Sequence, residues 1–263
     1  IAPPDVKGRE EILKIHSDKK KFANNVSLKS IAEDTAGYTG AELANILNES
    51  AIIATINGHN EIHQEDIEEA VKKVMVGVQK KTRVISDKEK KLTAYHEAGH
   101  AIVGKFLETT DPLKEISIIP RGIAGGYTMY KTNEDKFYKS KTELEERLVG
   151  LLGGRAAEKL ALNDISTGAR NDIQVATSIA KEMVTAYGMS ERLGPISLEE
   201  NENLAMFGES IEDVIGVEVK TLIDIAYKKA QDILRANMDK LEIVANMLLE
   251  RETITAEEFD EVF

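Results

Sequence analysis

The sequence predicts a mainly α-helical protein with one small β-sheet, and three observations lead to this fold class. Apolar residues recur at helical spacing through most of the chain. Only residues 114–119 and 127–130 show the short, β-branched or aromatic pattern of strands. A polar, basic stretch at about 77–90 separates two helical parts. We therefore expect a small all-α domain over residues 1–78, a linker over 79–90, and a mostly α-helical domain with the small sheet over 91–263.

The composition limits the classes of partner and of metal site. The 263-residue chain has a formal net charge of −12 and a pI near 5.1, so nucleic acid is not an expected partner. It contains no cysteine, which leaves His, Asp and Glu as the side chains that can hold a metal ion. No apolar run approaches the ~18 residues of a membrane span. The chain begins with Ile1 rather than Met, and we expect it to be a piece of a longer protein.

The first domain should consist of four short helices with a limited core. They are predicted at residues 8–21, 27–37, 40–56 and 64–76, with Ser27 as the cap of the second helix. The phosphate-binding pattern G-x-x-x-x-G-K-[ST] does not occur in the sequence. These residues by themselves should therefore not hydrolyse ATP.

The second domain should contain several longer helices around the two strands. Gly150, Gly153 and Gly154 fall inside one predicted helix, where glycine is unfavourable, so we expect another helix to pack closely against them. The helix of residues 92–106, with Asp87 as its cap, is the expected neighbour. The other predicted features are helices at 140–162, 169–188, 211–237 and 240–251, a loop at 190–208, and a final helical turn capped by Thr255.

A metal-binding pattern lies in the helix of residues 92–106. His96, Glu97 and His100 read H-E-x-x-H, and side chains four apart on a helix point the same way. Two imidazoles can hold zinc while the neighbouring carboxylate serves as a general base, which is the arrangement of zinc hydrolases. The competing interpretation is a helix with two surface histidines and a solvated glutamate.

A catalytic zinc site needs a third protein ligand. No histidine follows His100, so a carboxylate or a histidine from the first domain has to supply it. Glu158 and Asp172 are both suitable carboxylates, and the residues alone do not decide between them. His59 and His63 are also four apart, but Asn57 and Gly58 end the preceding helix, so we do not expect these two histidines to share a helical face or to form a site.

The strand before Pro120 has two possible roles. Ser117, Ile118 and Ile119 could pair with the extended backbone of a substrate, as an edge strand beside a metal site does in zinc proteases. Equally, the two strands could form a hairpin with a structural role only.

Several stretches of the first domain resemble the helical lid of AAA+ ATPases. They are PDVKGREEILKIH, TAGYTGAELANILNESA and QEDIEEAV. The resemblance implies that His16 meets a nucleotide, ATP or ADP, and that the backbone amides of Gly40 and Ala41 face its phosphates or base. The alternative is that His16 only packs between helices.

The remainder of the chain is similar to the FtsH family of ATP-dependent zinc proteases. The similarity rests on LTAYHEAGHAIVG, SIIPRG, GGYTMY, LLGGRAAEKL, TGARNDIQVAT and residues 183–195. It implies that zinc is held by His96, His100 and Asp172, that Glu97 is the general base, and that Glu158 lies outside the ligand set. One departure is the segment DPLKE at 111–115, where family members usually carry a histidine.

The resemblance also implies a function for the longer protein. It would be an ATP-dependent zinc metalloprotease that cleaves unfolded or membrane proteins, forms a homo-hexamer, and is anchored by an N-terminal segment in the bacterial inner membrane, facing the cytoplasm. The first alternative is a non-catalytic hexameric assembly or coupling module with structural zinc or none. The second is a zinc peptidase that works without ATP.

Overall fold

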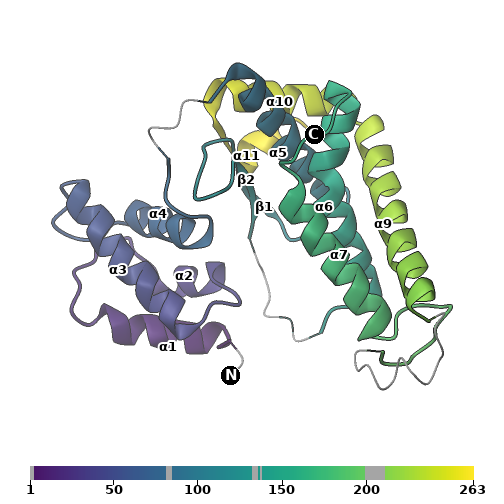
Figure 1. Ribbon diagram of the computed structural model, residues 1–263. Helices are drawn as coiled ribbons and strands as arrows, with labels where there is room; N and C mark the ends of the chain where they lie inside the picture. The colour runs from purple at the N-terminus through teal and green to yellow at the C-terminus, as the bar shows by residue number, and fades with distance from the viewer. Residues whose placement is uncertain (1–2, 81–84, 132–135, 137, 199–210) are drawn as a thin grey trace. The chain divides into compact units, whose positions relative to one another are not determined.

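The computed structural model describes residues 3–80, 85–131, 136, 138–198 and 211–263, and the chain divides into two compact units (Figure 1). One unit comprises Ile1–Val84 and Ile119–Phe137, and the other comprises Ile85–Ile118 and Tyr138–Phe263. The chain is mainly helical with one three-stranded sheet, which confirms the predicted fold class. Among the helices in the described ranges, none combines the length and the apolar content that a membrane crossing requires.

The first unit contains the four predicted short helices. They are α1 (Val6–Ser17), α2 (Leu28–Asp34), α3 (Gly40–Ile56) and α4 (Gln64–Met75). Side chains of Asp5, Ser27 and Thr39 accept backbone N–H groups at the first turns of α1, α2 and α3. The apolar faces of the helices meet in one small core, formed mainly by Leu13, Ile31, Leu43, Ile46, Leu47 and Ile67.

The second unit is built around α6 (Lys141–Leu162), which packs against three other helices. They are α5 (Asp87–Lys105), α7 (Arg170–Thr185) and α9 (Ile211–Arg235). Two helices close the chain, α10 (Met238–Arg251) on α5 and the short α11 (Ala256–Asp260) beside the sheet. The core of this unit is larger than that of the first, and its fully buried members include Ile102, Ile116, Leu148, Met183, Leu234 and Phe259.

The sheet has the strand order β2-β1-β3. Strands β1 (Leu113–Ser117) and β2 (Tyr127–Tyr130) correspond to the two predicted strands, although β1 ends at Ser117 rather than at residue 119. Strand β3 (Thr253–Thr255) was not predicted. It pairs antiparallel with β1, with Glu115 opposite Thr255, Ile116 opposite Ile254 and Ser117 opposite Thr253. A three-residue strand has too few residues to show an alternating pattern in the sequence.

The ends of several helices differ from the prediction. Ser86, not Asp87, caps α5, and its side chain accepts the N–H of Glu89, so Asp87 is the first helical residue. The long helix begins after Ser140 and the last turn after Thr255, as predicted. The predicted loop at 190–208 lies partly outside the described residues, and its described part, 190–198, contains neither helix nor strand.

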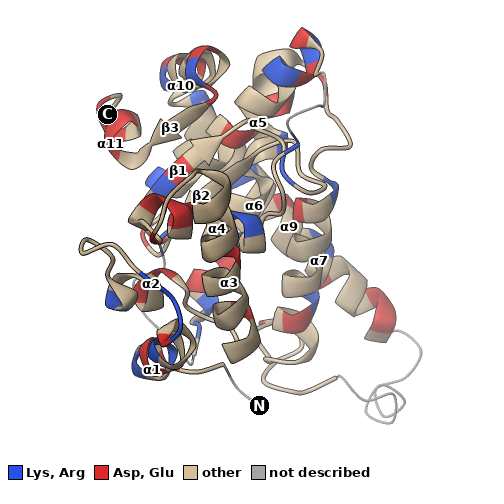
Figure 2. Ribbon diagram, turned by 90° about the vertical axis from the view of Figure 1, so that its left-hand side faces the viewer, with Lys and Arg blue, Asp and Glu red and all other residues tan. Residues whose placement is uncertain are grey.

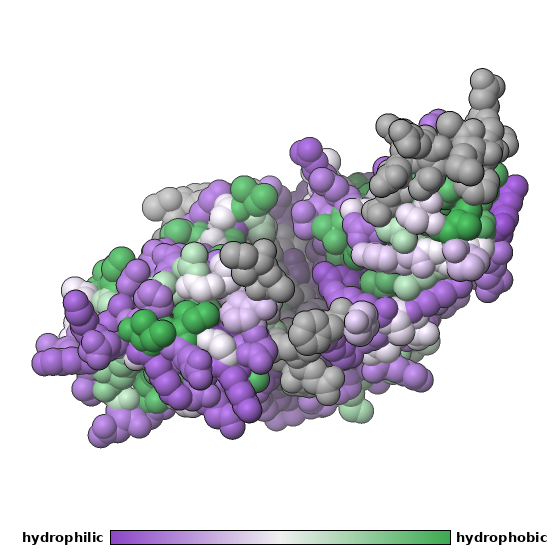
Figure 3. All heavy atoms as spheres, turned by 90° about the horizontal axis from the view of Figure 1, so that it is seen from below, coloured by the Kyte–Doolittle hydropathy of each residue, from purple (hydrophilic) through white to green (hydrophobic). Residues whose placement is uncertain are grey.

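Charged residues are distributed over the helices of both units. In Figure 2 the ribbon segments of Asp and Glu (red) and of Lys and Arg (blue) occur on several helices rather than gathering on one of them. The face in Figure 3 is largely hydrophilic, with apolar side chains in separate small groups. Both views agree with the composition of an acidic globular protein.

Helices α5 and α6 approach so closely that their backbones touch. A Cβ atom added at Gly99 of α5 would lie 2.5 Å from the Cβ of Ala157 and 2.7 Å from the carbonyl oxygen of Gly153, both on α6. A Cβ at Gly153 would lie 2.9 Å from the carbonyl oxygen of Gly99. These separations are shorter than van der Waals contact. The predicted close packing of the glycine-rich helix against the H-E-x-x-H helix is therefore confirmed.

We expect Gly99→Ala to destabilise the metal-free protein by about 1–3 kcal/mol, because the new methyl group meets backbone that cannot move alone. Gly150→Ala is the matched control on α6, since its nearest neighbour, Leu107 Cδ1, lies 4.0 Å from the added Cβ. That change should raise stability by up to about 1 kcal/mol through helix propensity. Urea unfolding measures both. Equal stability of the two variants would contradict the packing described here.

A buried carboxylate joins three elements of the second unit. Glu146 of α6 accepts the amide and the hydroxyl of Thr109 at 2.8 Å each and lies 3.5 Å from Lys229 Nζ of α9. Burial raises the pKa of Glu146, but the bonds from Thr109 and the charge of Lys229 outweigh burial and lower it below the usual value. The folded protein therefore stabilises the ionised form.

The stability due to Glu146 should depend on pH with a defined sign. Because its folded-state pKa lies below its unfolded value of about 4.3, the contribution is complete above that value and is lost as the pH falls through the folded pKa. We expect Glu146→Gln to cost about 1–3 kcal/mol at neutral pH and less in acid. Glu145→Gln, which removes only an exposed pair with Lys141, is the control. Denaturant unfolding at several pH values measures the difference, and parallel curves for the two variants would refute it.

Candidate metal centre

The H-E-x-x-H residues lie in the buried middle of α5. Ser86 caps the helix, and Ala94, Ala98 and Ile102 place one side of it in the core. His96 and Glu97 are themselves buried, with exposed fractions of 8% and 7%. The interpretation of the motif as surface histidines on a solvated helix is therefore wrong.

Three side chains from two helices converge on one point. The Nε2 atoms of His96 and His100 lie 3.0 Å apart, and Asp172 Oδ2, from the first turn of α7, lies 3.3 Å from the first and 3.7 Å from the second. Asp172 is separated from the histidines by some seventy residues of chain, but α5 and α7 both pack on α6. The structure therefore brings together the three residues for which the resemblance implied a ligand role.

The triangle of ligand atoms has the size that zinc requires. Zinc bonds of about 2.0–2.1 Å at tetrahedral angles put ligand atoms about 3.3 Å apart. The three distances between His96, His100 and Asp172 scatter around this value. Two imidazoles and one carboxylate form a donor set that suits zinc, and the fourth tetrahedral position is left for water or substrate. The residues present therefore fit this metal.

The other ring nitrogens fix the orientation of both histidines. His96 Nδ1 lies 2.7 Å from Glu158 Oε1, and His100 Nδ1 lies 2.8 Å from the carbonyl oxygen of Gly150. A carbonyl and an ionised carboxylate can only accept, so we assign the proton of each ring to Nδ1. Each Nε2 then directs its lone pair at the common point. This is how metal-binding histidines are usually held.

Glu158 contacts His96 at Nδ1, on the side of the ring away from the common point. Its second oxygen accepts the amide of Ser166 at 2.6 Å, and its side chain is 1% exposed. Burial raises the pKa of Glu158, whereas the bonds from His96 and Ser166 lower it more strongly, so the carboxylate stays ionised. Of the two carboxylates that the sequence left open, Asp172 lies beside both Nε2 atoms, and Glu158 lies on the Nδ1 side of His96.

The surroundings of the triad favour added positive charge. Burial lowers the pKa of His96, but the bonds with Asp172 and Glu158 and the charge of Glu97 reverse this and raise the pKa to about 10. Burial raises the pKa of Asp172, yet the bonds to His100 and His96 keep it well below the usual range. A cation at the centre of the triad meets the same field that favours a proton there.

Gly154 provides the space for the site. A Cβ atom at this position of α6 would lie 2.6 Å from the Nε2 atoms of both His96 and His100. Any side chain there would therefore enter the metal position. The carbonyl of Gly150, one turn earlier, is the acceptor for His100. Its role had no signal in the sequence, because every residue carries the same carbonyl group.

The residues for which the resemblance implied nucleotide contact lie at two helix ends of the first unit. His16 is exposed in the last turn of α1. Gly40 and Ala41 open α3 after the cap Thr39, and a Cβ at Gly40 would meet Ile12 of α1 at 3.6 Å. A nucleotide contact at these residues stays a prediction.

The predicted substrate strand is largely occupied by other pairings. Ser117 pairs with Thr253, and the amide of Ile118 donates to the carbonyl oxygen of Glu252 at 2.9 Å. Ser117 and Ile118 are buried, and β1 is the middle strand of the sheet. Backbone pairing of a substrate with residues 117–119 stays a prediction. It would have to use backbone groups that the bonds to Thr253 and Glu252 do not occupy.

The second histidine pair differs from the expectation. His59 and His63 share no helix, as predicted, but their rings stack with centroids 4.3 Å apart. Together with Glu65 they are the other group, within the described residues, whose geometry could hold a metal ion. The expectation that they form no site assumed that only a shared helical face could bring them together.

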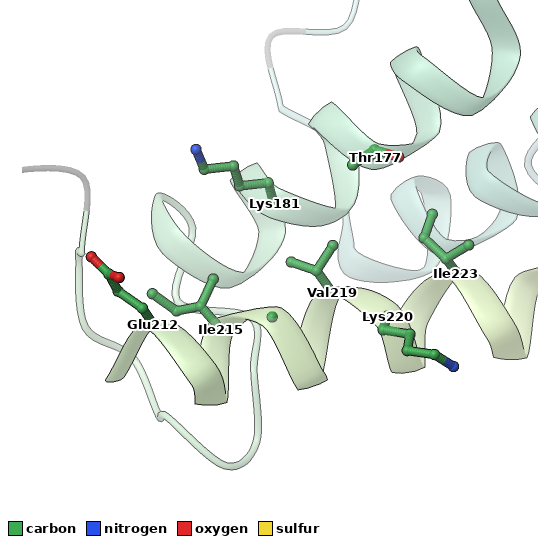
Figure 4. A pocket seen from close by; sticks show the side chains of 8 residues that line it. Thr177, Lys181, Glu212, Ile215, Val219, Lys220 and Ile223 are labelled. Atoms are coloured by element: carbon green, nitrogen blue, oxygen red, sulfur yellow. The ribbon is translucent and has the colours of Figure 1, made fainter. Parts of the chain in front are cut away.

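A shallow pocket of about 420 Å³ lies between α7 and α9. Figure 4 shows Ile215, Val219 and Ile223 of α9 pointing toward α7, with Lys181 and Lys220 at its borders. None of the three converging residues lines this pocket. It is a feature separate from the candidate metal centre.

Comparison with known proteins places most of the chain in described families. Residues 83–262 match the model of peptidase family M41, and residues 25–69 match that of the AAA+ lid domain. The protein "ATP-dependent zinc metalloprotease FtsH" of Caldicellulosiruptor bescii is 53% identical over 97% of this chain and 43% of its own length. "ATP-dependent zinc metalloprotease FtsH 1" of Thermoanaerobacter sp. is 51% identical over 100% of this chain and 45% of its own. The chain thus spans less than half the length of these relatives.

Proposed function

Because this chain belongs to peptidase family M41, we propose that it is the lid and peptidase part of an ATP-dependent zinc metalloprotease that cleaves peptide bonds. The observation that carries the proposal is the zinc-sized triangle of His96, His100 and Asp172 beside the buried Glu97. The triangle is part of the matched region of the chain.

The proposed mechanism assigns one task to each residue. Zinc, when bound, supplies a Lewis acid that polarises the scissile carbonyl and makes water more acidic. His96, His100 and Asp172 would hold the ion, while Glu158 and the carbonyl of Gly150 keep the two imidazoles in the required tautomer. Glu97 takes a proton from the attacking water and passes it to the leaving amine as the peptide bond breaks.

The first unit supports the ATP-dependent part of the proposal. Its match to the AAA+ lid over residues 25–69 and the names of the relatives support an activity that depends on ATP. We propose that His16, Gly40 and Ala41 contact the nucleotide from the lid. We propose a homo-hexamer of full-length chains, and a membrane anchor at the bacterial inner membrane supplied by a preceding segment. Unfolded and membrane proteins are the proposed substrates.

Metal removal and return tests the proposal directly. Full-length protein treated with chelator should lose cleavage of casein and regain it with about one zinc per chain. Metal analysis and peptide release are measured on the same samples, and a folded tagged substrate is added with and without ATP. ATP-dependent loss of the folded substrate supports the coupled protease.

Other outcomes would identify a different function. A folded, oligomeric protein without metal and without cleavage would identify a non-catalytic assembly module and overturn the proposal. Equal degradation of the folded substrate with and without ATP would leave the zinc peptidase and remove the coupling to ATP.

A further inference from the structure

We infer that the first unit contains a second, solvent-accessible site for a divalent transition-metal ion of the zinc type, formed by His59, His63 and Glu65. One ligand atom from each of these residues lies within 4.8 Å of the other two. The two histidines lie in the segment that connects α3 to α4, and Glu65 lies in the first turn of α4 (Figure 1). It is distinct from the candidate metal centre, shares no residue with it, and does not depend on the proposed function.

The turn holds both histidine backbones in place. Gly58 has the left-handed φ of +76° that reverses the chain after α3, and the amide of His59 donates to the carbonyl oxygen of Ala54 at 2.8 Å. The amide of His63 donates to Asp66 Oδ2 at 3.0 Å. The stacked rings, inclined by 13°, therefore stand on a fixed backbone rather than on a mobile loop.

A buried carboxylate orients His59 as Glu158 orients His96. Asp66 is fully buried, and its Oδ2 lies 2.9 Å from His59 Nδ1 while Oδ1 accepts Asn57 Nδ2 at 2.9 Å. A carboxylate that holds one ring nitrogen leaves the other nitrogen available to a metal. His59 Nε2 indeed lies on the side of Glu65, whose Oε1 is 3.7 Å away.

The donor set determines the class of ion. Two imidazoles and one carboxylate suit zinc and its neighbours nickel and copper, and they do not suit calcium or magnesium, which prefer oxygen ligands. The separation of 3.7 Å between His59 Nε2 and Glu65 Oε1 is close to the ~3.3 Å between tetrahedral zinc ligands. The side chain of Glu65 is 71% exposed, so it can rotate to bring its carboxylate closer to His59 Nε2.

The charges around His59 and His63 also favour a bound cation. The site lies at the N-terminus of α4, where the helix dipole alone disfavours positive charge. Glu65 and Asp66, both in the first turn, offset the dipole. An exposed position leaves water to complete the coordination, so the site should bind metal reversibly and more weakly than the buried triad.

The test counts zinc ions per chain against buffered free zinc, using equilibrium dialysis and metal analysis of the intact chain. We expect two binding steps, with the second at higher free zinc. His63→Asn should abolish the second step, and it should keep the fold because Asn is a favourable helix cap. Glu65→Gln should weaken the second step at least about tenfold.

The matched control is Glu68→Gln, which removes an exposed carboxylate one turn further along α4 and should leave both steps unchanged. Circular dichroism confirms that each variant is folded. A single step in the parent protein would overturn the inference, and so would a second step that survives in His63→Asn. If the parent protein lacks the step at low free zinc but keeps the step at higher free zinc, the result counts against the candidate metal centre and not against this site.

Discussion

Glu97→Gln should abolish peptide cleavage while the protein keeps its fold and its zinc. The amide has nearly the same shape as the carboxylate, so the buried position is preserved. It cannot accept the proton of the attacking water, and general acid–base catalysis is worth about 10²–10⁴-fold in rate. We expect casein cleavage by the full-length variant to fall by that factor, with one zinc per chain still present.

The control for this experiment lies on the same helix. Glu89→Gln changes an exposed carboxylate in the first turn of α5, and it should leave the rate unchanged. If Glu97→Gln cleaves casein at the parent rate, Glu97 is not the general base. If the variant loses zinc together with activity, the residue supports the metal rather than the proton transfer.

Asp172→Asn and Glu158→Gln should separate the two carboxylates by the size of their effects on zinc binding. Loss of a contact behind a metal ligand typically costs about 10–100-fold in affinity, and we expect this of Glu158→Gln because His96 keeps its place but loses its anionic partner. Asp172→Asn removes a charged atom at the metal position itself. Its effect should be larger, with activity lost at ordinary zinc levels.

Competition with a fluorescent chelator measures both affinities. Asp164→Asn, an exposed carboxylate in the connection between α6 and α7, is the control and should bind zinc like the parent. The reverse order, with Glu158→Gln the more damaging substitution, would exchange the roles of the two residues. Equal and small effects would exclude both as ligands of a tight site.

Local patterns predicted most of the helices, because many begin with a side-chain cap and continue with a regular apolar spacing. The bounds of α3 and the cap Ser140 of α6 are examples. Small errors occurred where two suitable caps are adjacent, as at Ser86 and Asp87. The family resemblance was also correct, since the chain matches family M41 along most of its length.

Contacts between distant segments could not be predicted in the same way. The sequence left Glu158 and Asp172 equivalent, because their difference depends on which side of α6 faces His96 and on where the first turn of α7 packs. Strand β3 exists through its pairing with β1, and three residues alone carry no periodicity. The stacking of His59 on His63 depends on the path of a turn, which no helical or strand period describes.

The position of Asp172 has a consequence for the stability of the fold. An ion held by His100 of α5 and Asp172 of α7 is a cross-link that closes a loop of roughly 70 residues around α6. By the entropy estimate for covalent cross-links, closing a loop of that length restricts the unfolded chain by about 4 kcal/mol. The same three side chains would then also stabilise the fold, and removal of the ion would lower the free energy of unfolding of the second unit.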